Sequence, residues 1–181
     1  EQNAPAFAEK GPFRQVPVLE VDGPDGPRHL SQSMAIAEWL EETFPEPPLF
    51  PQDRWARARA RELAEMVNSG IQPLQNLRVL RSLQASGMDP RPWCREVIGR
   101  GFAAIEARLA HTAGAHAVGD ALGLVEAFLV PQLYSARRFE VPLEPYPTLL
   151  RVEAACLEHP ALVAAHPDAQ PDAPPPDART P

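Results

Sequence analysis

The chain has 181 residues, enough to bury about 70% of its unfolded surface in one or two domains. Its net charge of −7 at pH 7 argues against non-specific binding to nucleic acid or to an anionic membrane surface. No apolar run is long enough to span a membrane, and the two cysteines, Cys94 and Cys156, have no C-x-x-C spacing. We therefore expect a cytoplasmic protein with a small-molecule partner.

The N-terminal quarter of the chain is predicted to form a β-hairpin followed by a helix. One or two helical turns come first, with Asn3 as N-cap and Pro5 near the start. A strand over 16–21, a turn of glycine and proline, and a second strand over 28–30 follow. The next helix begins at Gln32 and ends before Pro45. Its apolar residues share one stripe that excludes its glutamates, Glu41 among them.

Two short motifs in this hairpin region suit ligand binding. Val16-Pro17 opens the first strand, and an X-Pro bond is almost the only place where a cis peptide occurs. Gln32-Ser33 places a hydroxyl beside the N–H groups of a helix start, which is an arrangement that binds carboxylates. Each motif also has an ordinary structural interpretation, as a strand-opening proline and an N-cap serine.

The segment 45–52 contains four prolines and is predicted to be an extended connector between two domains. Apolar residues beyond it recur at helical spacing. Asp53 is predicted to cap a long helix that continues almost to Leu83, with a kink near Ser69-Gly70 because Pro73 removes one backbone hydrogen bond. Polar residues around this bend fit either a solvated face or the lining of a cleft.

Three further helices are predicted, over 92–110, from Gly123 to about 139, and over 146–157, with a short turn at 160–165. Residues 166–181 are polar and rich in proline and are predicted to be a disordered tail. The expected organisation is a domain over 1–44, a connector over 45–52, an all-α domain over 53–165, and the tail.

The histidines give no sign of a metal site, since they lack helical i, i+4 pairing or a cysteine partner. We therefore expect no metal. The five histidines are His29, His111, His116, His159 and His166.

The order of these motifs resembles the glutathione transferase superfamily. The string Ile71-Gln-Pro-Leu-Gln-Asn76 is the most specific feature, and it resembles the zeta class, whose best-known activity is maleylacetoacetate isomerisation. Further matching strings lie in 68–77, 118–120, 129–134, 135–139, 145–148 and 170–172. The resemblance implies a thioredoxin-like α/β N-terminal domain, incomplete here, and an all-α C-terminal domain.

The same resemblance implies the residues of a glutathione site. Val16 and the cis-Pro17 bond would pair with the cysteinyl unit of glutathione, and Gln32 and Ser33 would hold the γ-glutamyl carboxylate. Arg138 matches the arginine that the family is thought to use on a substrate carboxylate. The other matching positions are Gln2, Gln72, Asn76, Leu77 and Arg78.

The implied reaction is glutathione-dependent cis–trans isomerisation of maleylacetoacetate in aromatic amino-acid breakdown, by a homodimer. The alternatives are maleylpyruvate isomerisation, general glutathione transfer or dehalogenation of α-halo acids, or a non-catalytic binding or dimerisation module. The Ser-Ser or Ser-Cys motif that activates the thiol in the family has no counterpart here, so the catalytic residue is unknown. We expect that an N-terminal β-α-β segment carrying this motif precedes Glu1.

One departure from the family pattern affects stability. The family usually has Thr-Pro-Thr-Leu-Ala-Asp where this chain has Ala121-Leu-Gly-Leu-Val-Glu126. The capping box then becomes Gly123 with Glu126, in which the glutamate can still reach back to the N-cap.

Overall fold

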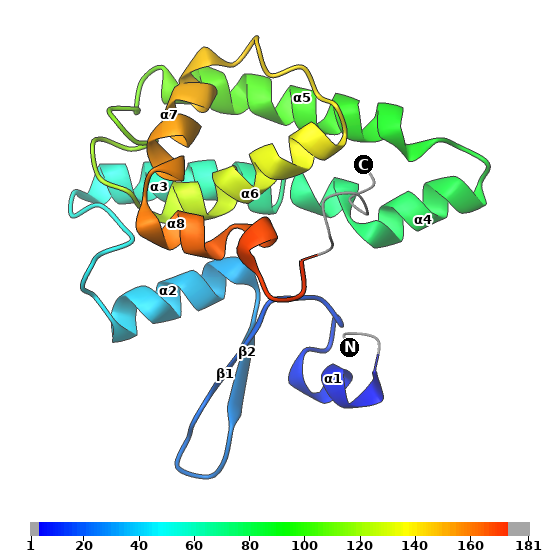
Figure 1. The fold of residues 1–181 in the computed structure, drawn as a ribbon. Helices are drawn as coiled ribbons and strands as arrows, with labels where there is room; N and C mark the ends of the chain where they lie inside the picture. Colours follow the sequence, from blue (N-terminus) through cyan, green and yellow to red (C-terminus); the bar gives the residue numbers. More distant parts are fainter. Residues whose placement is uncertain (1–3, 174–181) are drawn as a thin grey trace. The chain divides into compact units, whose positions relative to one another are not determined.

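A computed structural model describes residues 4–173 of the chain (Figure 1). It contains two compact units, a hairpin unit over Glu1–Leu49 and a helical unit over Phe50–Pro181. The division falls inside the segment 45–52, where the prolines predict a connector. Each unit is considered separately below.

The hairpin unit contains one helix, an antiparallel hairpin and a second helix. In chain order these are α1 (Pro5–Lys10), β1 (Val18–Val21), β2 (Arg28–Ser31) and α2 (Ser33–Thr43). The N-cap of α1 is Ala4, and the predicted cap, Asn3, lies outside the described residues. Strand β1 begins two residues later than predicted, after Pro17, which has no N–H to donate to the ladder.

The hairpin is held by a tight turn and by one carboxylate. Gly26 adopts φ +116° in the turn, a conformation that side chains rarely adopt. In β1, before the turn, Glu20 accepts from Lys10 Nζ at 2.6 Å and lies 2.8 Å from His29 Nε2. Contact with the Lys10 ammonium lowers the pKa of Glu20. This contact joins α1 to both strands of the hairpin.

Helix α2 differs from the prediction at one glutamate. Glu41 is only 8% exposed, although the apolar stripe was expected to exclude it. Its Oε2 accepts from the backbone N–H of Leu49 at 2.7 Å. The carboxylate is buried because it satisfies a backbone donor in the segment that follows the helix, which helical periodicity cannot reveal.

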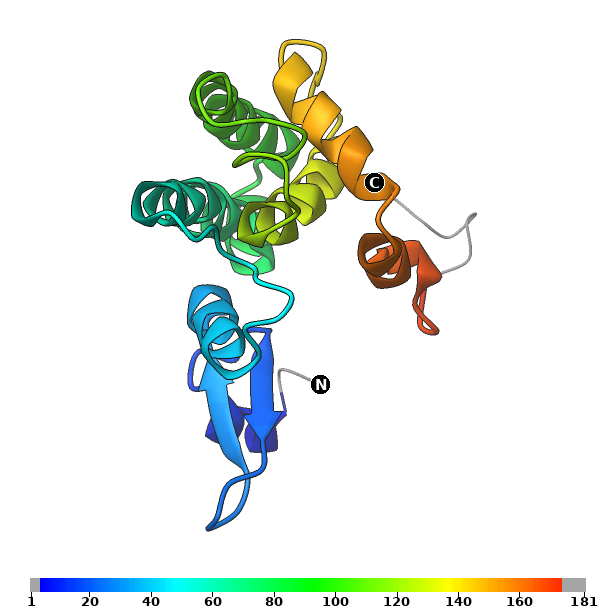
Figure 2. The same cartoon turned by 90° about the vertical axis from the view of Figure 1, so that its left-hand side faces the viewer.

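The helical unit contains eight helical segments among the described residues (Figures 1 and 2). Helix α3 packs against α5 and α6, and α7 packs against α5 and α6. Their buried apolar side chains form one core, in which Phe102 is the largest fully buried residue. The segments are α3 (Arg54–Asn68), η1 (Gln72–Gln75), α4 (Leu77–Ala85), α5 (Pro90–Leu109), α6 (Leu124–Arg138), α7 (Pro147–Leu157), α8 (Pro160–Ala165) and η2 (Pro167–Ala169).

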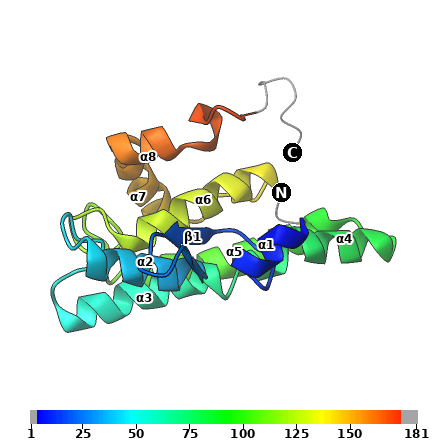
Figure 3. The same ribbon diagram turned by 90° about the horizontal axis from the view of Figure 1, so that it is seen from below.

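The predicted long kinked helix is wrong, because the chain breaks into α3, η1 and α4 (Figure 3). A Cβ on Gly70 would lie 2.5 Å from the carbonyl oxygen of Met66, so the chain leaves the helix where only glycine fits. Pro73 then lies in the first turn of η1, where its missing N–H has no cost. Asn76 starts α4 afresh, accepting from the backbone N–H of Arg78 at 3.2 Å. The sequence pattern alone could not distinguish a kink within one helix from the start of two new helical segments.

Helix α5 supports α7 through hydrogen bonds across the core. Glu106 accepts from the backbone N–H groups of Thr148 and Leu149, both at 2.9 Å. These donors belong to the first turn of α7 and have no partner within that helix. The Tyr146 hydroxyl donates to the Gly99 carbonyl at 3.0 Å. Helix α7 is therefore capped by a different helix.

The first part of the predicted tail contains local structure. After α8, residues Pro167–Ala169 form η2, and the Gln170 side chain donates to the carbonyls of Ala164 and His166. The remainder of the predicted tail, residues 174–181, lies outside the described residues. No helix in the described part of the chain has the length and apolar character needed to cross a membrane.

Candidate functional site

The open end of the hairpin brings together the two motifs that the sequence singles out. Val18 pairs with Ser31 at the end of the ladder, so the residues before Val18 and after Ser31 lie at the same end of the hairpin. Val16-Pro17 and Gln32-Ser33 are those residues. The Val16-Pro17 peptide bond is cis, as predicted. Val16 is 65% exposed, and no hydrogen bond among residues 4–173 uses its backbone N–H or C=O.

The start of α2 offers donors beside this exposed backbone. Gln32 is exposed and has φ +80° and ψ 115°, a sparsely populated conformation that non-glycine residues adopt at a cost of about 1–3 kcal/mol, commonly at ligand sites. The first helical hydrogen bond is donated by Ile36, so the N–H groups of the first turn have no partner within the helix. The Ser33 hydroxyl likewise makes no hydrogen bond within the described residues. These groups can bind a carboxylate.

Gln2, also predicted to contact glutathione, lies outside the described residues. The hairpin unit therefore supports Val16, Pro17, Gln32 and Ser33 as one cluster. This cluster combines an exposed backbone that has no partner among the described residues with the start of a helix, two features that together suit a peptide ending in a carboxylate.

In the helical unit, two contacts fix the break between α3 and α4. The side chains of Gln75 and Gln132 exchange two hydrogen bonds, of 2.6 and 3.3 Å. The indole Nε1 of Trp93 donates to the Leu74 carbonyl at 2.8 Å. Gln75 therefore has a structural role, which distinguishes it from the polar residues nearby that were predicted to bind a ligand.

The four residues predicted to bind glutathione in this region, Gln72, Asn76, Leu77 and Arg78, lie close together in the sequence at this break. Gln72, Leu77 and Arg78 are exposed, and Leu77 is 57% exposed although it is apolar. Asn76 uses its side-chain oxygen to cap α4 and keeps its amide donors for another partner. The Arg78 guanidinium makes no ion pair among residues 4–173. These side chains are available for binding.

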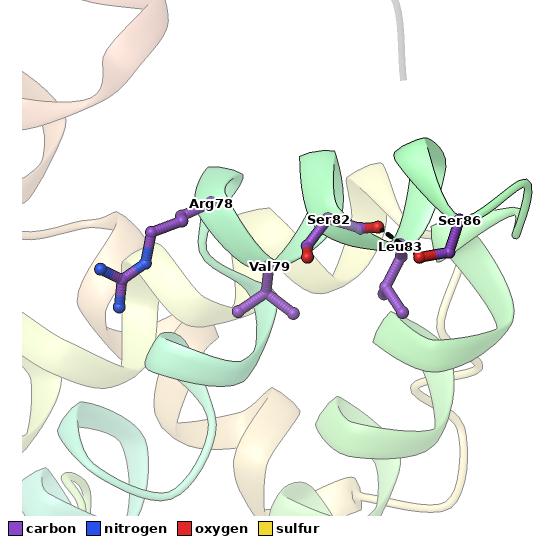
Figure 4. Close-up of a pocket in the computed structure, with 5 residues that line it drawn as sticks. All are labelled: Arg78, Val79, Ser82, Leu83 and Ser86. Atoms are coloured by element: carbon purple, nitrogen blue, oxygen red, sulfur yellow. Dashed lines mark hydrogen bonds between the residues drawn. The ribbon is translucent and has the colours of Figure 1, made fainter.

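Arg78 also borders a hollow that the sequence analysis missed (Figure 4). Ser82 and Ser86 follow Arg78 at intervals of four residues and line the same hollow, with Val79 and Leu83 between them. The helical i, i+4, i+8 spacing of one arginine and two serines was the available signal. A cationic group with two hydroxyls gives this side of α4 a polar face.

The two arginines at the end of α6 have different surroundings. Arg137 donates through both terminal nitrogens to Glu153, at 2.5 Å each, and Glu153 is buried. This pairing raises the pKa of Arg137. Arg138 is exposed, and its side chain has no partner within the described residues. Arg138, the predicted substrate residue, is thus the arginine that is available to an incoming carboxylate.

The cysteines of this chain do not suit the role of thiol activator or nucleophile. Cys94 and Cys156 are both unpaired and fully buried. Burial raises the pKa of Cys94. The pKa of Cys156 rises to about 12, chiefly through burial and further through the charges of Glu126 and Glu153. The catalytic residue therefore remains unassigned.

One further cluster contradicts the sequence analysis. The expectation that no histidine has a cysteine partner is wrong, because His116 Nδ1 lies 3.8 Å from Cys156 Sγ and 3.7 Å from Glu126 Oε1. The two residues are 40 positions apart, and the packing of α7 brings them together. No spacing rule for metal motifs covers such a distance.

Comparison with known proteins defines the class. Residues 1–43 match the glutathione S-transferase N-terminal domain. A crystal structure of maleylacetoacetate isomerase from Anaeromyxobacter dehalogenans, with dicarboxyethyl glutathione and citrate in its active site, superposes with a TM-score of 0.89. Its sequence is 53% identical, covering 98% of this chain and 83% of that one. The fold, with a thioredoxin-like part and an all-α part, is that of a glutathione transferase, as predicted.

Two further relatives define the family more closely. A bacterial maleylpyruvate isomerase, described as a zeta-class glutathione S-transferase, is 42% identical with a TM-score of 0.88, covering 96% of this chain and 82% of that one. Probable maleylacetoacetate isomerase 2 of Drosophila melanogaster is 45% identical over 97% of this chain and 74% of its own length. The chain belongs to the maleylacetoacetate isomerase family, the zeta class of glutathione transferases.

Proposed function

We propose that the protein binds glutathione and catalyses the cis–trans isomerisation of maleylacetoacetate to fumarylacetoacetate. The observation that carries this proposal is the hairpin end, where the exposed backbone of Val16 lies beside the strained Gln32 and the start of α2. This arrangement fits an extended tripeptide with a carboxylate at one end. The family relationship supports the same ligand.

Each part of the cluster has a distinct task in binding. The N–H and C=O of Val16 pair with the cysteinyl backbone of glutathione as an added strand would. Gln32 and Ser33 hold the γ-glutamyl carboxylate, which the positive end of α2 favours. The family resemblance assigns Gln72, Asn76, Leu77 and Arg78 to glutathione as well, and three of these side chains, all but Asn76, are exposed.

Arg138 binds a carboxylate of the maleyl substrate. Bound glutathione supplies a thiolate that adds reversibly to the activated double bond, so that the resulting single bond can rotate before the thiolate leaves. Arg138 favours this chemistry by holding the dianionic substrate and by stabilising the negative charge that develops when the bond is attacked. Its guanidinium suits this task because it is charged throughout the physiological pH range and matches a carboxylate in geometry.

Maleylpyruvate is the second candidate substrate, because a maleylpyruvate isomerase is among the close structural relatives. Both substrates carry a maleyl group and a carboxylate, so Arg138 would serve either. We further propose that the protein acts in the cytoplasm as a homodimer. The two unpaired cysteines support the first point, and the family resemblance supports the second.

The test is an isomerase assay on the purified protein with maleylacetoacetate and with maleylpyruvate, each with and without glutathione. Isomerisation that requires glutathione is the expected result. Glutathione binding, measured separately by calorimetry, distinguishes an enzyme from a binding module. Binding without isomerisation of either substrate would contradict the proposed activity but leave the proposed ligand in place. Light scattering on the same preparation tests the homodimer.

A further inference from the structure

A cluster of three metal-ligating side chains lies in the helical unit, and the glutathione reaction does not use it. His116 comes from the loop between α5 and α6, Glu126 from the first turn of α6, and Cys156 from the last turn of α7. The ring nitrogen, carboxylate oxygen and sulfur all lie within 4.8 Å of one another. Glu126 and Cys156 are buried, and the His116 side chain is 14% exposed.

The spacing of these atoms leaves room for a shared ion, although Cys156 Sγ and His116 Nδ1 also lie within hydrogen-bond distance for sulfur. His116 Nδ1 and Glu126 Oε1 are 3.7 Å apart, beyond the usual range of about 2.7–3.2 Å for an N–H···O bond. Zinc bonds of about 2.3 Å to sulfur and 2.0–2.2 Å to nitrogen or oxygen place tetrahedral ligand atoms about 3.3–3.6 Å apart. The observed 3.7 and 3.8 Å exceed that range by a few tenths of an ångström, and all three ligand atoms lie within 4.8 Å, so the side chains would move closer together on binding.

The carboxylate is held firmly while retaining the capacity to bind a metal. Glu126 Oε1 accepts from the Ala117 N–H at 2.7 Å, and Oε2 accepts from the Gly123 N–H at 3.0 Å. Each carboxylate oxygen has about two acceptor positions, so one remains on each oxygen. The second of these bonds is the capping contact that the sequence predicts, and both fix the orientation of the carboxylate towards His116 and Cys156.

We propose that His116, Glu126 and Cys156 bind a zinc ion, with a water molecule at the fourth position on the partly exposed histidine side. One nitrogen, one oxygen and one sulfur ligand form a set typical of zinc, which accepts all three. A thiolate and a carboxylate balance the two positive charges of the ion. Binding joins the loop before α6 to the ends of α6 and α7.

This site is separate from the residue proposed to bind substrate on the same helix. Glu126 lies in the first turn of α6 and Arg138 at its last residue, which at 1.5 Å per residue is a separation of about 18 Å. The ion is therefore assigned no part in the glutathione reaction. The thiol loses its proton on binding, so the affinity for zinc rises with pH.

Cobalt provides the direct test. The whole protein is treated with a chelator and titrated with Co²⁺, whose bond to a thiolate gives charge-transfer absorption in the near ultraviolet. We expect one equivalent to bind and Zn²⁺ to displace it. Cys156→Ala abolishes the absorption, and His116→Gln, which removes a ligand, weakens binding by more than the roughly 10- to 100-fold that loss of an outer-sphere partner costs.

Cys94→Ala and His111→Gln are the matched controls, because Cys94 is the other buried cysteine and His111 is an exposed histidine at the end of α5. Both should bind cobalt as the unaltered protein does. Circular dichroism verifies that each variant is folded. If Cys156→Ala does not fold, His116→Gln decides, since its side chain reaches solvent. Absence of the thiolate absorption in the folded protein, or its persistence in His116→Gln with unchanged affinity, would overturn the proposal.

Discussion

At the scale of single residues, Arg137 and Arg138 are neighbours on α6 that differ in their partners. Arg137 pairs with the buried Glu153, whereas the Arg138 side chain has no partner within the described residues. Replacing Arg138 by alanine should lower kcat/KM for the maleyl substrate about 10- to 100-fold, the loss of one charge-assisted hydrogen bond. Thermal unfolding of this variant should be unchanged.

The matched control is Arg137→Ala, which should affect stability instead. It leaves the carboxylate of Glu153 buried without its partner, which costs about 2 kcal/mol of unfolding free energy given that Arg137 itself is half-exposed. Denaturant unfolding measures this loss. If Arg138→Ala retained full activity, the residue would have no part in the reaction.

Ser33 can be tested in the same way in the hairpin unit. Its hydroxyl has no partner within the described residues, so Ser33→Ala should leave the melting temperature nearly unchanged. The KM for glutathione should rise about 5- to 20-fold, the loss of one hydrogen bond to a carboxylate. Ser69→Ala is the control, because that exposed serine donates only to the carbonyl of Glu65 in its own helix. Equal effects of the two variants on KM would contradict the role assigned to Ser33.

Cys156 makes the metal-free protein sensitive to alkaline pH. Its pKa is about 12 in the folded state against 9.0 for the ordinary thiol, so the folded protein retains a proton that the unfolded chain releases. The contribution of this group to stability is therefore complete below pH 9 and decreases as the pH rises towards 12. Denaturant unfolding should show a steeper loss over this interval than in Cys156→Ala. Parallel curves would contradict this prediction.

At the scale of secondary-structure elements, two glycines of α5 differ in the space available for a side chain. A Cβ on Gly101 would lie 2.3 Å from Ile71 Cδ1, in the core, whereas a Cβ on Gly99 would have its nearest neighbour at 3.6 Å, the Tyr146 hydroxyl. Gly101→Ala should therefore lower the unfolding free energy by about 1–3 kcal/mol through overpacking. Gly99→Ala should raise it by up to about 1 kcal/mol, because alanine favours helix. Denaturant unfolding of both variants compares them directly, and a stabilised Gly101→Ala would refute the packing argument.

The helices and strands were predictable from the sequence where periodicity and caps agree. Asp53 caps α3 by accepting from the Ala56 N–H, and α2 and α7 end at or within one residue of their predicted limits. The break between α3 and α4 was not predictable from the sequence. It depends on the close approach of Gly70 to the Met66 carbonyl and on the hydrogen bond from Trp93 Nε1 to the Leu74 carbonyl. Tertiary contacts of this kind leave no periodic signal.

The same distinction holds for the two clusters of candidate ligand-binding residues. The proximity of Val16-Pro17 and Gln32-Ser33 could be predicted because a hairpin and the helix start that follows it act over a few residues of sequence. The cluster of His116, Glu126 and Cys156 could not, because it depends on the packing of α7 against the loop before α6. Sequence spacing predicts sites built from one element better than sites built from three.

At the scale of the whole molecule, Ser33 belongs to the hairpin unit and Arg138 to the helical unit. Ser33 is assigned to glutathione and Arg138 to the maleyl substrate, so the two residues are expected to act on different ligands. The double variant Ser33→Ala with Arg138→Ala should therefore lose activity by the product of the single losses. Steady-state kinetics at varied concentrations of both ligands gives the three values. A double variant no worse than either single one would show that both residues act on the same step.

The bonds from Glu106 to Thr148 and Leu149 bear on the order in which the helical unit assembles. Helix α7 receives its first-turn cap from a residue about 42 positions earlier, so an isolated α7 peptide lacks that support. The amide protons of Thr148 and Leu149 lose these acceptors when α5 and α7 separate. Their hydrogen exchange should thus report the opening of the whole helical core, and not the fraying that normally governs the first turn of a helix.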